Sequence, residues 1–292
     1  MLLGLAAVTL WSTAATAFKL ALAHLHVLQL LAISVTVSLA CLLGVVARQG
    51  RLQWLVEYLR QAPLYFLCMG LLSPLVYYLI LLHAYTLLPA QQAQTINYTW
   101  AITLALLAVP VLGHRLTPRD WAAVALGYAG VVIIATEGQL LALRFSSLEG
   151  VLYALASTLV WAVFWLAGTR SRRDPVVSLA LYFLVALVPV WVACVTLAGL
   201  PRSLSGLAPA VYVGMFEMGF TYVLWSTALR LSSSVSRVGN LIFLSPMLSL
   251  VFIASILKEP IHPATLVGLA FILPGIMLQQ GSAAAGEDLH NA

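Results

Sequence analysis

Apolar segments of about 20 residues recur along the whole chain, and short connections separate them. A helix needs about 20 apolar residues to cross a bilayer. Ten such segments lie near residues 2–22, 27–47, 63–83, 89–112, 118–136, 147–169, 176–198, 207–230, 234–256 and 262–280. Prolines at 63, 89, 118, 175 and 263 mark several of the connections, as expected where one helix ends and the next begins. The pattern predicts an all-α polytopic membrane protein with ten transmembrane helices.

Composition supports a membrane protein. The chain has 292 residues, of which 62% are hydrophobic and 8% are charged, and its mean hydropathy is +1.02. A soluble domain carries about 25% charged residues. Residues 2–10 are apolar and "ATA" follows at 15–17, but no basic region precedes them as in a signal peptide. We therefore expect the first segment to be a retained span.

The basic residues lie mainly in alternate connections. The connections after the even spans hold Arg48, Arg51, Arg60, Arg115, Arg119, Arg170, Arg172, Arg173, Arg230 and Arg237, and those after the odd spans hold Lys19, Arg144, Arg202 and Lys258. Basic connections stay in the cytoplasm, so the sequence predicts a multi-pass protein of the bacterial inner membrane with both termini cytoplasmic. The net charge of +5 follows from these connections and does not indicate a nucleic-acid partner.

The two halves of the chain are weakly similar. A shift of 145 residues places "LGHRLTPRDWAAVALGYAG" (112–130) over "LKEPIHPATLVGLAFILPG" (257–275), and a shift of 150 places Trp11 over Trp161. The matches predict five-helix repeats over 1–137 and 147–280, followed by a disordered tail over 281–292. Because five is odd, the second repeat enters the membrane inverted, as in many secondary transporters.

The fourth span begins with an unusual polar stretch, "PAQQAQTINYTW" (89–100). On a helix Gln91, Gln94, Thr95 and Tyr98 share one face, and an unpaired amide in lipid costs several kcal/mol. This face is therefore predicted to line a central cavity, with Asn97 beside it; hydrogen bonds between helices are the alternative. Trp100 points almost opposite Tyr98, so only a bend in the helix would direct both rings into one cavity.

The ninth span mirrors the fourth. The shift of 145 residues places Asn240 under Thr95, Phe243 under Tyr98 and Ser245 under Trp100. Pro246 removes a backbone donor and leaves a carbonyl that cavity water or neighbouring groups can satisfy. We therefore expect Asn240 and Ser245 to make polar contacts with a substrate. A packing kink is the alternative for Pro246.

Aromatic residues are frequent in the same spans. They are Trp11, Tyr77, Tyr78, Tyr98, Trp100, Trp161, Trp165, Tyr222 and Trp225. Some are expected in the interfacial belts, where tryptophan and tyrosine concentrate, and others in packing. Those near mid-depth, Trp11, Tyr78, Tyr98, Trp100 and Trp161, are predicted to bind a flat or apolar substrate group.

One acidic residue lies near mid-depth. Glu217 is roughly 15 Å from the predicted start of the eighth span at 1.5 Å per residue, and carboxylates inside membranes are costly and usually functional. Three roles stay open: it could bind a substrate ammonium, carry a proton, or pair with a neighbouring donor.

The motifs of common enzymes are missing. The chain has no H-E-x-x-H, G-x-S-x-G or G-x-x-x-x-G-K-[ST] sequence, so we expect neither catalysis nor built-in ATP hydrolysis. Three cysteines, Cys41, Cys68 and Cys194, lie apart in apolar segments and are interpreted as packing residues. No cofactor and no metal site is predicted.

The sequence resembles the drug/metabolite transporter superfamily, in particular its ten-helix EamA-type branch. The resemblance lies in "LSPMLSLVFIASILKEPIHPATLVGLAFILPGIML" (244–278) and its first-half counterpart "ITLALLAVPVLGHRLTPRDWAAVALGYAGVVII" (102–134). With its aromatic residues the chain is similar to aromatic amino-acid exporters of the YddG type. The resemblance implies a basket in which spans 1, 3, 4, 6, 8 and 9 line a central cavity and spans 5 and 10 pack behind.

These observations predict a secondary transporter, either a facilitator or a proton-coupled exporter, that moves small metabolites by alternating access. The resemblance favours aromatic or other neutral amino acids. A drug, purine or nucleotide-sugar carrier of the same superfamily is the first alternative, and an intramembrane enzyme or receptor is the second. The expected partners are a small-molecule substrate and the lipid bilayer, with no nucleic acid; the prediction is compatible with a monomer.

Overall fold

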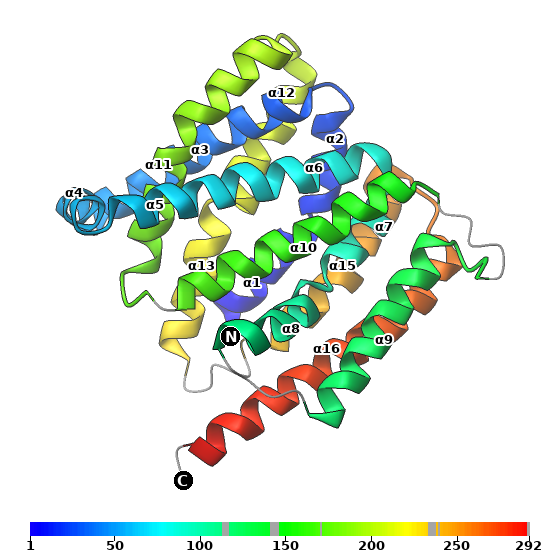
Figure 1. Cartoon of the computed structure of the whole chain (residues 1–292). Helices are drawn as coiled ribbons and strands as arrows, with labels where there is room; N and C mark the ends of the chain where they lie inside the picture. Colours follow the sequence, from blue (N-terminus) through cyan, green and yellow to red (C-terminus); the bar gives the residue numbers. More distant parts are fainter. Residues whose placement is uncertain (113–116, 141–145, 170, 233–237, 239, 291–292) are drawn as a thin grey trace.

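The protein is a bundle of helices that cross one another around a common centre (Figure 1). The computed structural model describes residues 1–290 except 113–116, 141–145, 170, 233–237 and 239, and it does not describe the side chains of 112, 169, 240 and 279–290. Within these described ranges every regular element is helical and no strand occurs. The predicted all-α class is therefore confirmed.

The first half of the chain contains ten elements. They are α1 (Leu2–Ser12), α2 (Ala14–Leu22), α3 (Val27–Arg48), α4 (Leu52–Gln61), α5 (Pro63–Gly70), η1 (Leu71–Val76), α6 (Tyr77–Leu87), α7 (Ala90–Asn97), α8 (Trp100–Leu112) and α9 (Pro118–Ala135).

The second half contains ten further described elements. Its elements are α10 (Leu148–Thr169), α11 (Pro175–Ala193), η2 (Cys194–Ala198), α12 (Leu204–Tyr212), η3 (Val213–Glu217), α13 (Phe220–Leu231), η4 (Asn240–Phe243), α15 (Leu244–Phe252), η5 (Ile253–Leu257) and α16 (Pro263–His290). The disorder predicted for 281–292 stays a prediction.

Seven helical segments of the described chain are long and apolar enough to cross a membrane. They are Leu2–Leu22, Val27–Arg48, Pro63–Leu87, Pro118–Ala135, Leu148–Gly168, Pro175–Ala198 and Leu204–Leu231. Two shorter apolar helices, Leu241–Leu257 and Pro263–Leu278, occupy the ninth and tenth predicted spans. The fourth predicted span consists of α7 and α8, which an interruption separates. The protein is therefore a multi-pass membrane protein.

Local sequence explains where several helices begin. Proline is the first residue of α5, α9, α11 and α16, a position where its missing N–H costs nothing. Asp174 caps α11, since its Oδ1 accepts from the backbone N–H groups of Val176 and Val177 at 3.0 Å each. Its Oδ2 accepts from Arg51 at 2.7 Å. This ion pair connects the start of α11 to the connection before α4.

α9 and α16 pack against each other as a closely spaced pair (Figure 1). A Cβ on Gly130 would lie 2.5 Å from the carbonyl oxygen of Gly268, and one on Gly275 would lie 2.9 Å from that of Ala123. Only small residues allow two helix backbones to come this close. These glycines therefore allow α9 and α16 to pack closely.

The remaining helices surround the centre. α3 packs on α11, α6 on α10, and α1 on α13, while α2 contacts α12. Several of the central helices are interrupted midway, at Thr13 between α1 and α2, at Ser73 in η1, and at Tyr98–Thr99 between α7 and α8. Interruptions of this kind are tolerated at membrane depth where they face protein or a cavity.

Candidate functional site

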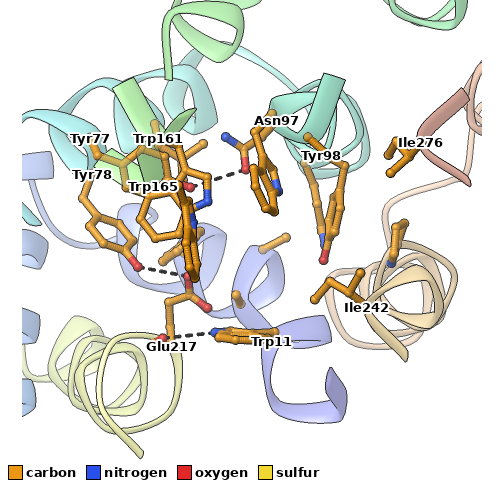
Figure 2. Close-up of a pocket in the computed structure, with 18 of the residues that line it drawn as sticks. Trp11, Tyr77, Tyr78, Asn97, Tyr98, Trp161, Trp165, Glu217, Ile242 and Ile276 are labelled. Atoms are coloured by element: carbon orange, nitrogen blue, oxygen red, sulfur yellow. Dashed lines mark hydrogen bonds between the residues drawn. The ribbon is translucent and has the colours of Figure 1, made fainter. Parts of the chain in front are cut away.

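A cavity of about 290 Å³ lies where the interrupted helices meet. Its volume is near the lower end of small-molecule sites. Its walls come from α1, α2, α6, α7, α8, α10, η3, α13, η4, α15 and α16. The side chains in its walls are mainly aromatic and aliphatic, with few polar groups among them (Figure 2). An apolar pocket with a few placed polar groups is the usual form of a ligand site.

The interruption in the fourth span directs two aromatic rings into this cavity. α7 ends at Asn97 and α8 begins at Trp100, and Tyr98 and Trp100 both line the cavity. The Thr99 hydroxyl and its N–H both bond to the carbonyl of Ile96, three residues back. Local bonds of this type compete with the regular helical pattern. The bend that the sequence required is therefore present.

Glu217 presents its carboxylate to the cavity from the end of η3. Its Oε1 accepts from the Tyr78 hydroxyl at 3.2 Å, and its backbone carbonyl accepts from Trp11 Nε1 at 3.3 Å (Figure 2). The described residues give Glu217 no ion-pair partner, since their one salt bridge joins Arg51 and Asp174. The carboxylate therefore faces an aromatic environment with one neutral donor bound.

Aromatic rings form a connected wall beside Glu217. Trp161 stacks on Tyr77 with ring centroids 4.4 Å apart and meets Trp165 and Tyr222 at 6.1 and 6.5 Å. Trp11 contacts Tyr222 at 5.5 Å. Aromatic contacts of this geometry contribute about 0.5–1.5 kcal/mol each beyond burial. The wall is therefore held in place by its own packing.

The structure brings most of the predicted site residues together. Lining the cavity are Trp11, Tyr78, Asn97, Tyr98, Trp100, Trp161 and Glu217. Ser245 lies behind the wall, fully buried, where its hydroxyl accepts from the Tyr98 hydroxyl at 2.5 Å and from Ser12 at 3.2 Å. Ser245 therefore positions Tyr98 instead of facing the cavity. The side chain of Asn240 lies outside the part of the chain that the structure describes.

The polar stripe of α7 divides into two groups. Gln94 and Asn97 line the cavity, and Asn97 donates to Ser157 at 2.8 Å and accepts from Tyr77 at 3.4 Å. Thr95 bonds to the carbonyl of Gln91 within the helix, while Gln91 itself points to the connection before α16. The stripe thus serves both the cavity and contacts between helices, the two interpretations that the sequence left open.

Sequence reasoning missed several lining residues. Phe18 and Tyr85 lie seven residues after Trp11 and Tyr78, two helical turns along the same face, so helical periodicity could have found them. Leu273 and Ile276 of α16 also line the cavity. The expectation that the tenth span only packs behind is therefore wrong, because α16 contacts both α7 and α8 at the cavity wall.

Polar contacts join the start of α7 to the chain segment before α16. Glu259 accepts from the backbone N–H groups of Ala90 and Gln91 at 3.1 and 3.3 Å and from Gln91 Nε2 at 3.0 Å. Gln91 also donates to the carbonyl of Pro260 at 2.8 Å and accepts from the N–H of His262 at 2.8 Å. We call Gln91, Glu259, Pro260 and His262 the latch. It joins the start of α7 to the connection between η5 and α16.

The rings nearest the latch are buried. Phe18 and Tyr85 are 2% and 3% exposed, and their centroids are 5.2 Å apart. Lys19 donates to the Tyr85 carbonyl at 2.7 Å. At the other end Trp100 and Trp225 are partly exposed. The cavity is therefore more exposed at its end toward the start of α1 than at its end toward the latch.

Interrupted apolar helices around an aromatic cavity are the arrangement expected of a membrane transporter. A family model described as the EamA-like transporter family matches residues 1–136 and 148–279. The chain belongs to this family, and the branch suggested by 102–134 and 244–278 is confirmed.

Three curated relatives are transporters by name. The chain is 26% identical to the aromatic amino acid exporter YddG of Ancylobacter novellus, over 85% of each protein. It is 28% identical to a probable terminal-alkyne amino-acid exporter of Streptantibioticus cattleyicolor, over 75% of this chain and 73% of the relative. It is 25% identical to the uncharacterized transporter YvbV of Bacillus subtilis, over 74% and 71%.

A solved crystal structure has the same fold. It aligns with a TM-score of 0.66 over 96% of this chain and 97% of the other, at 23% identity.

Proposed function

We propose that the protein is a secondary transporter that carries aromatic or other neutral amino acids across the bacterial inner membrane. The cavity is the observation that carries this proposal, because it combines a carboxylate for an ammonium group with an aromatic wall for a side chain. Two relatives named as amino-acid exporters support the same substrate class. Trp11, Tyr78, Tyr98, Trp100 and Trp161 would contact the side chain, and Asn97 and Glu217 the polar groups. Asn240 stays a proposed polar contact.

We further propose that the chain forms ten spans in two inverted repeats, 1–137 and 147–280. A two-fold axis between the repeats would exchange span 1 with span 6, 2 with 7, 3 with 8, 4 with 9 and 5 with 10. The contact between α6 and α10 would then correspond to the contact between α13 and α1. The contact between α3 and α11 and the contact between α9 and α16 would each be related to themselves. All four of these helix pairs are in contact. The interruptions η1 and η3 also lie in the corresponding third and eighth spans.

Alternating access is the proposed mechanism. Substrate would enter from the open side, and the halves would then rock to break the latch and close the open end. The distribution of arginine supports a cytoplasmic location for both termini and for the open side, since α1 begins there. Transport would be driven by the substrate gradient or by a proton carried on Glu217.

The latch gives a direct test of this mechanism. Glu259→Ala removes three hydrogen bonds to a carboxylate. A hydrogen bond of this kind contributes about 1.5–3 kcal/mol at most. We expect the latch side to open more often, so that a cysteine placed at Ala15 in the cavity wall reacts about tenfold faster or more with an impermeant thiol reagent added on that side. The background variant would carry serine at Cys41, Cys68 and Cys194.

Glu149→Ala is the matched control. Glu149 is an exposed carboxylate at the start of α10, so its removal should leave the reaction rate unchanged. Equal rates in the Glu259→Ala and Glu149→Ala proteins would contradict the proposed gate.

Uptake into proteoliposomes tests the function itself. The panel would contain labelled phenylalanine, tyrosine, tryptophan, leucine and alanine, with and without a pH gradient. We expect at least one aromatic amino acid to move faster than into protein-free vesicles. If none of the amino acids moved, the substrate class would be wrong, although the family would stand. Stimulation by the pH gradient that Glu217→Gln abolishes would distinguish proton coupling from facilitation.

A further inference from the structure

The charge balance of the cavity suggests which part of a substrate is recognised. Among the described lining residues Glu217 supplies the one carboxyl group, and no lysine, arginine or histidine lines the cavity. An amino acid carries both an ammonium and a carboxylate. The described residues of the cavity therefore offer a carboxyl group to the substrate ammonium. They offer no cationic side chain to the substrate carboxylate.

The surroundings of Glu217 suit a cation. The Tyr78 hydroxyl donates to the Glu217 carboxylate and Trp11 donates to the Glu217 backbone carbonyl, while the Trp11 ring meets that of Tyr222 at 5.5 Å. The faces of such rings attract ammonium groups. Only one of the two carboxylate oxygens accepts a hydrogen bond from the described residues. The other is left for a ligand donor.

The donors available to the rest of a substrate are neutral. Trp165 Nε1 is buried and has no hydrogen-bond partner among the described residues, although buried donors are nearly always paired. Trp165 lines the cavity. One N–H of the Asn97 amide donates to Ser157, and its second N–H is likewise neutral. A single neutral N–H serves a carbonyl oxygen well, whereas a desolvated carboxylate without a cation is costly to bury.

We propose that the site recognises an aromatic ring and an ammonium group, and that a free carboxylate on the substrate is dispensable and unfavourable. In this arrangement Glu217 binds the ammonium, the ring wall binds the side chain, and Trp165 Nε1 donates to a carbonyl. Monocationic amides, esters and amines of aromatic amino acids would then be better ligands than the zwitterions. This inference rests on the proposed transport function and narrows the chemistry of that same site.

Competition with labelled phenylalanine in proteoliposomes tests the inference. The competitors are phenylalaninamide, phenethylamine, phenylalanine and 3-phenylpropionate, which differ in the ammonium and the carboxylate alone. We expect phenylalaninamide to inhibit at about one tenth of the concentration of phenylalanine or less, phenethylamine to inhibit as well, and 3-phenylpropionate to have no effect. Direct uptake of labelled phenethylamine would be measured beside the labelled amino acid.

Two variants connect the preference to the proposed residues. Glu217→Gln should weaken phenylalaninamide about thirtyfold or more, the usual result of removing one partner of a buried ion pair. Trp165→Phe keeps an aromatic ring in the wall and removes the N–H, so it should weaken phenylalaninamide several times more than phenethylamine, which has no carbonyl. Glu57→Gln, an exposed carboxylate on α4, is the control and should change nothing.

The outcomes separate this inference from the proposed function. If phenylalanine is transported and both phenylalaninamide and phenethylamine fail to compete, the substrate carboxylate is required. The inference is then wrong, while the proposed function stands. Binding of the substrate carboxylate at the start of α8 would produce this result. Equal inhibition by all three ammonium compounds in the wild type and in Glu217→Gln would also overturn it. If no compound is transported or competes, the proposed function fails as well.

Discussion

Replacing Trp161 by alanine is expected to lower the initial rate of uptake, at substrate concentrations below KM, by about thirtyfold or more, if the proposed transport function is correct. Trp161 is 8% exposed and its ring contacts Tyr77, Phe164, Trp165 and Tyr222. Truncating a buried tryptophan costs about 3–5 kcal/mol in packing. The loss would also remove a central part of the aromatic wall.

The variant must be shown to fold before its transport is interpreted. Trp161→Phe keeps a ring in the wall and should retain more uptake than Trp161→Ala, and both would be compared per unit of monodisperse protein in detergent. Trp121→Ala is the matched control, because Trp121 is 58% exposed on α9 and should tolerate the same change. A folded Trp161→Ala protein with wild-type uptake would show that the cavity wall does not bind substrate.

Replacing Gly130 by valine is expected to destabilise the protein by about 2–3 kcal/mol or more. A Cβ at this position would lie 2.5 Å from the Gly268 carbonyl oxygen and 2.7 Å from Cγ1 of Ile272. The carbonyl is backbone, so the clash can only be relieved by moving α9 away from α16. For a chain of this size we expect the melting temperature in detergent to fall by about 5–10 °C.

Gly44→Val provides the matched control for that measurement. Gly44 lies in α3, and a Cβ there would meet no atom within 4 Å, so the same substitution adds a side chain without a clash. The difference in melting temperature between the two variants isolates the contact between the helices. Equal melting temperatures would mean that α9 and α16 are less closely packed than the structure describes.

The fourth span shows how far local sequence could be used. Its polar residues, Gln94, Asn97 and Tyr98, predicted a face that avoids lipid, and this face lines the cavity. The same helical geometry placed Trp100 on the opposite side of a straight helix. Both rings line the cavity because the hydrogen-bond pattern breaks at Thr99, where no proline marks the break.

Ser245 and Gln91 show what local sequence could not provide. Both are polar residues at membrane depth or near it, and both were candidates for the cavity by the same argument. Ser245 accepts hydrogen bonds from the hydroxyls of Tyr98 and Ser12, and Gln91 donates one to Glu259. A buried polar group needs a hydrogen-bond partner, but the sequence around it does not identify that partner.

The sequence by itself determined that this protein is an all-helical, multi-pass membrane protein of the EamA-like family, because long apolar segments and turn residues act over a few neighbouring residues. It also determined which residue types were available for a central site. Only the tertiary structure decided that Glu217 faces Tyr78, that Phe18, Tyr85, Leu273 and Ile276 complete the cavity, and that Glu259 binds the start of α7. These contacts join residues more than a hundred positions apart or on different helices, and their geometry depends on how the interrupted helices cross.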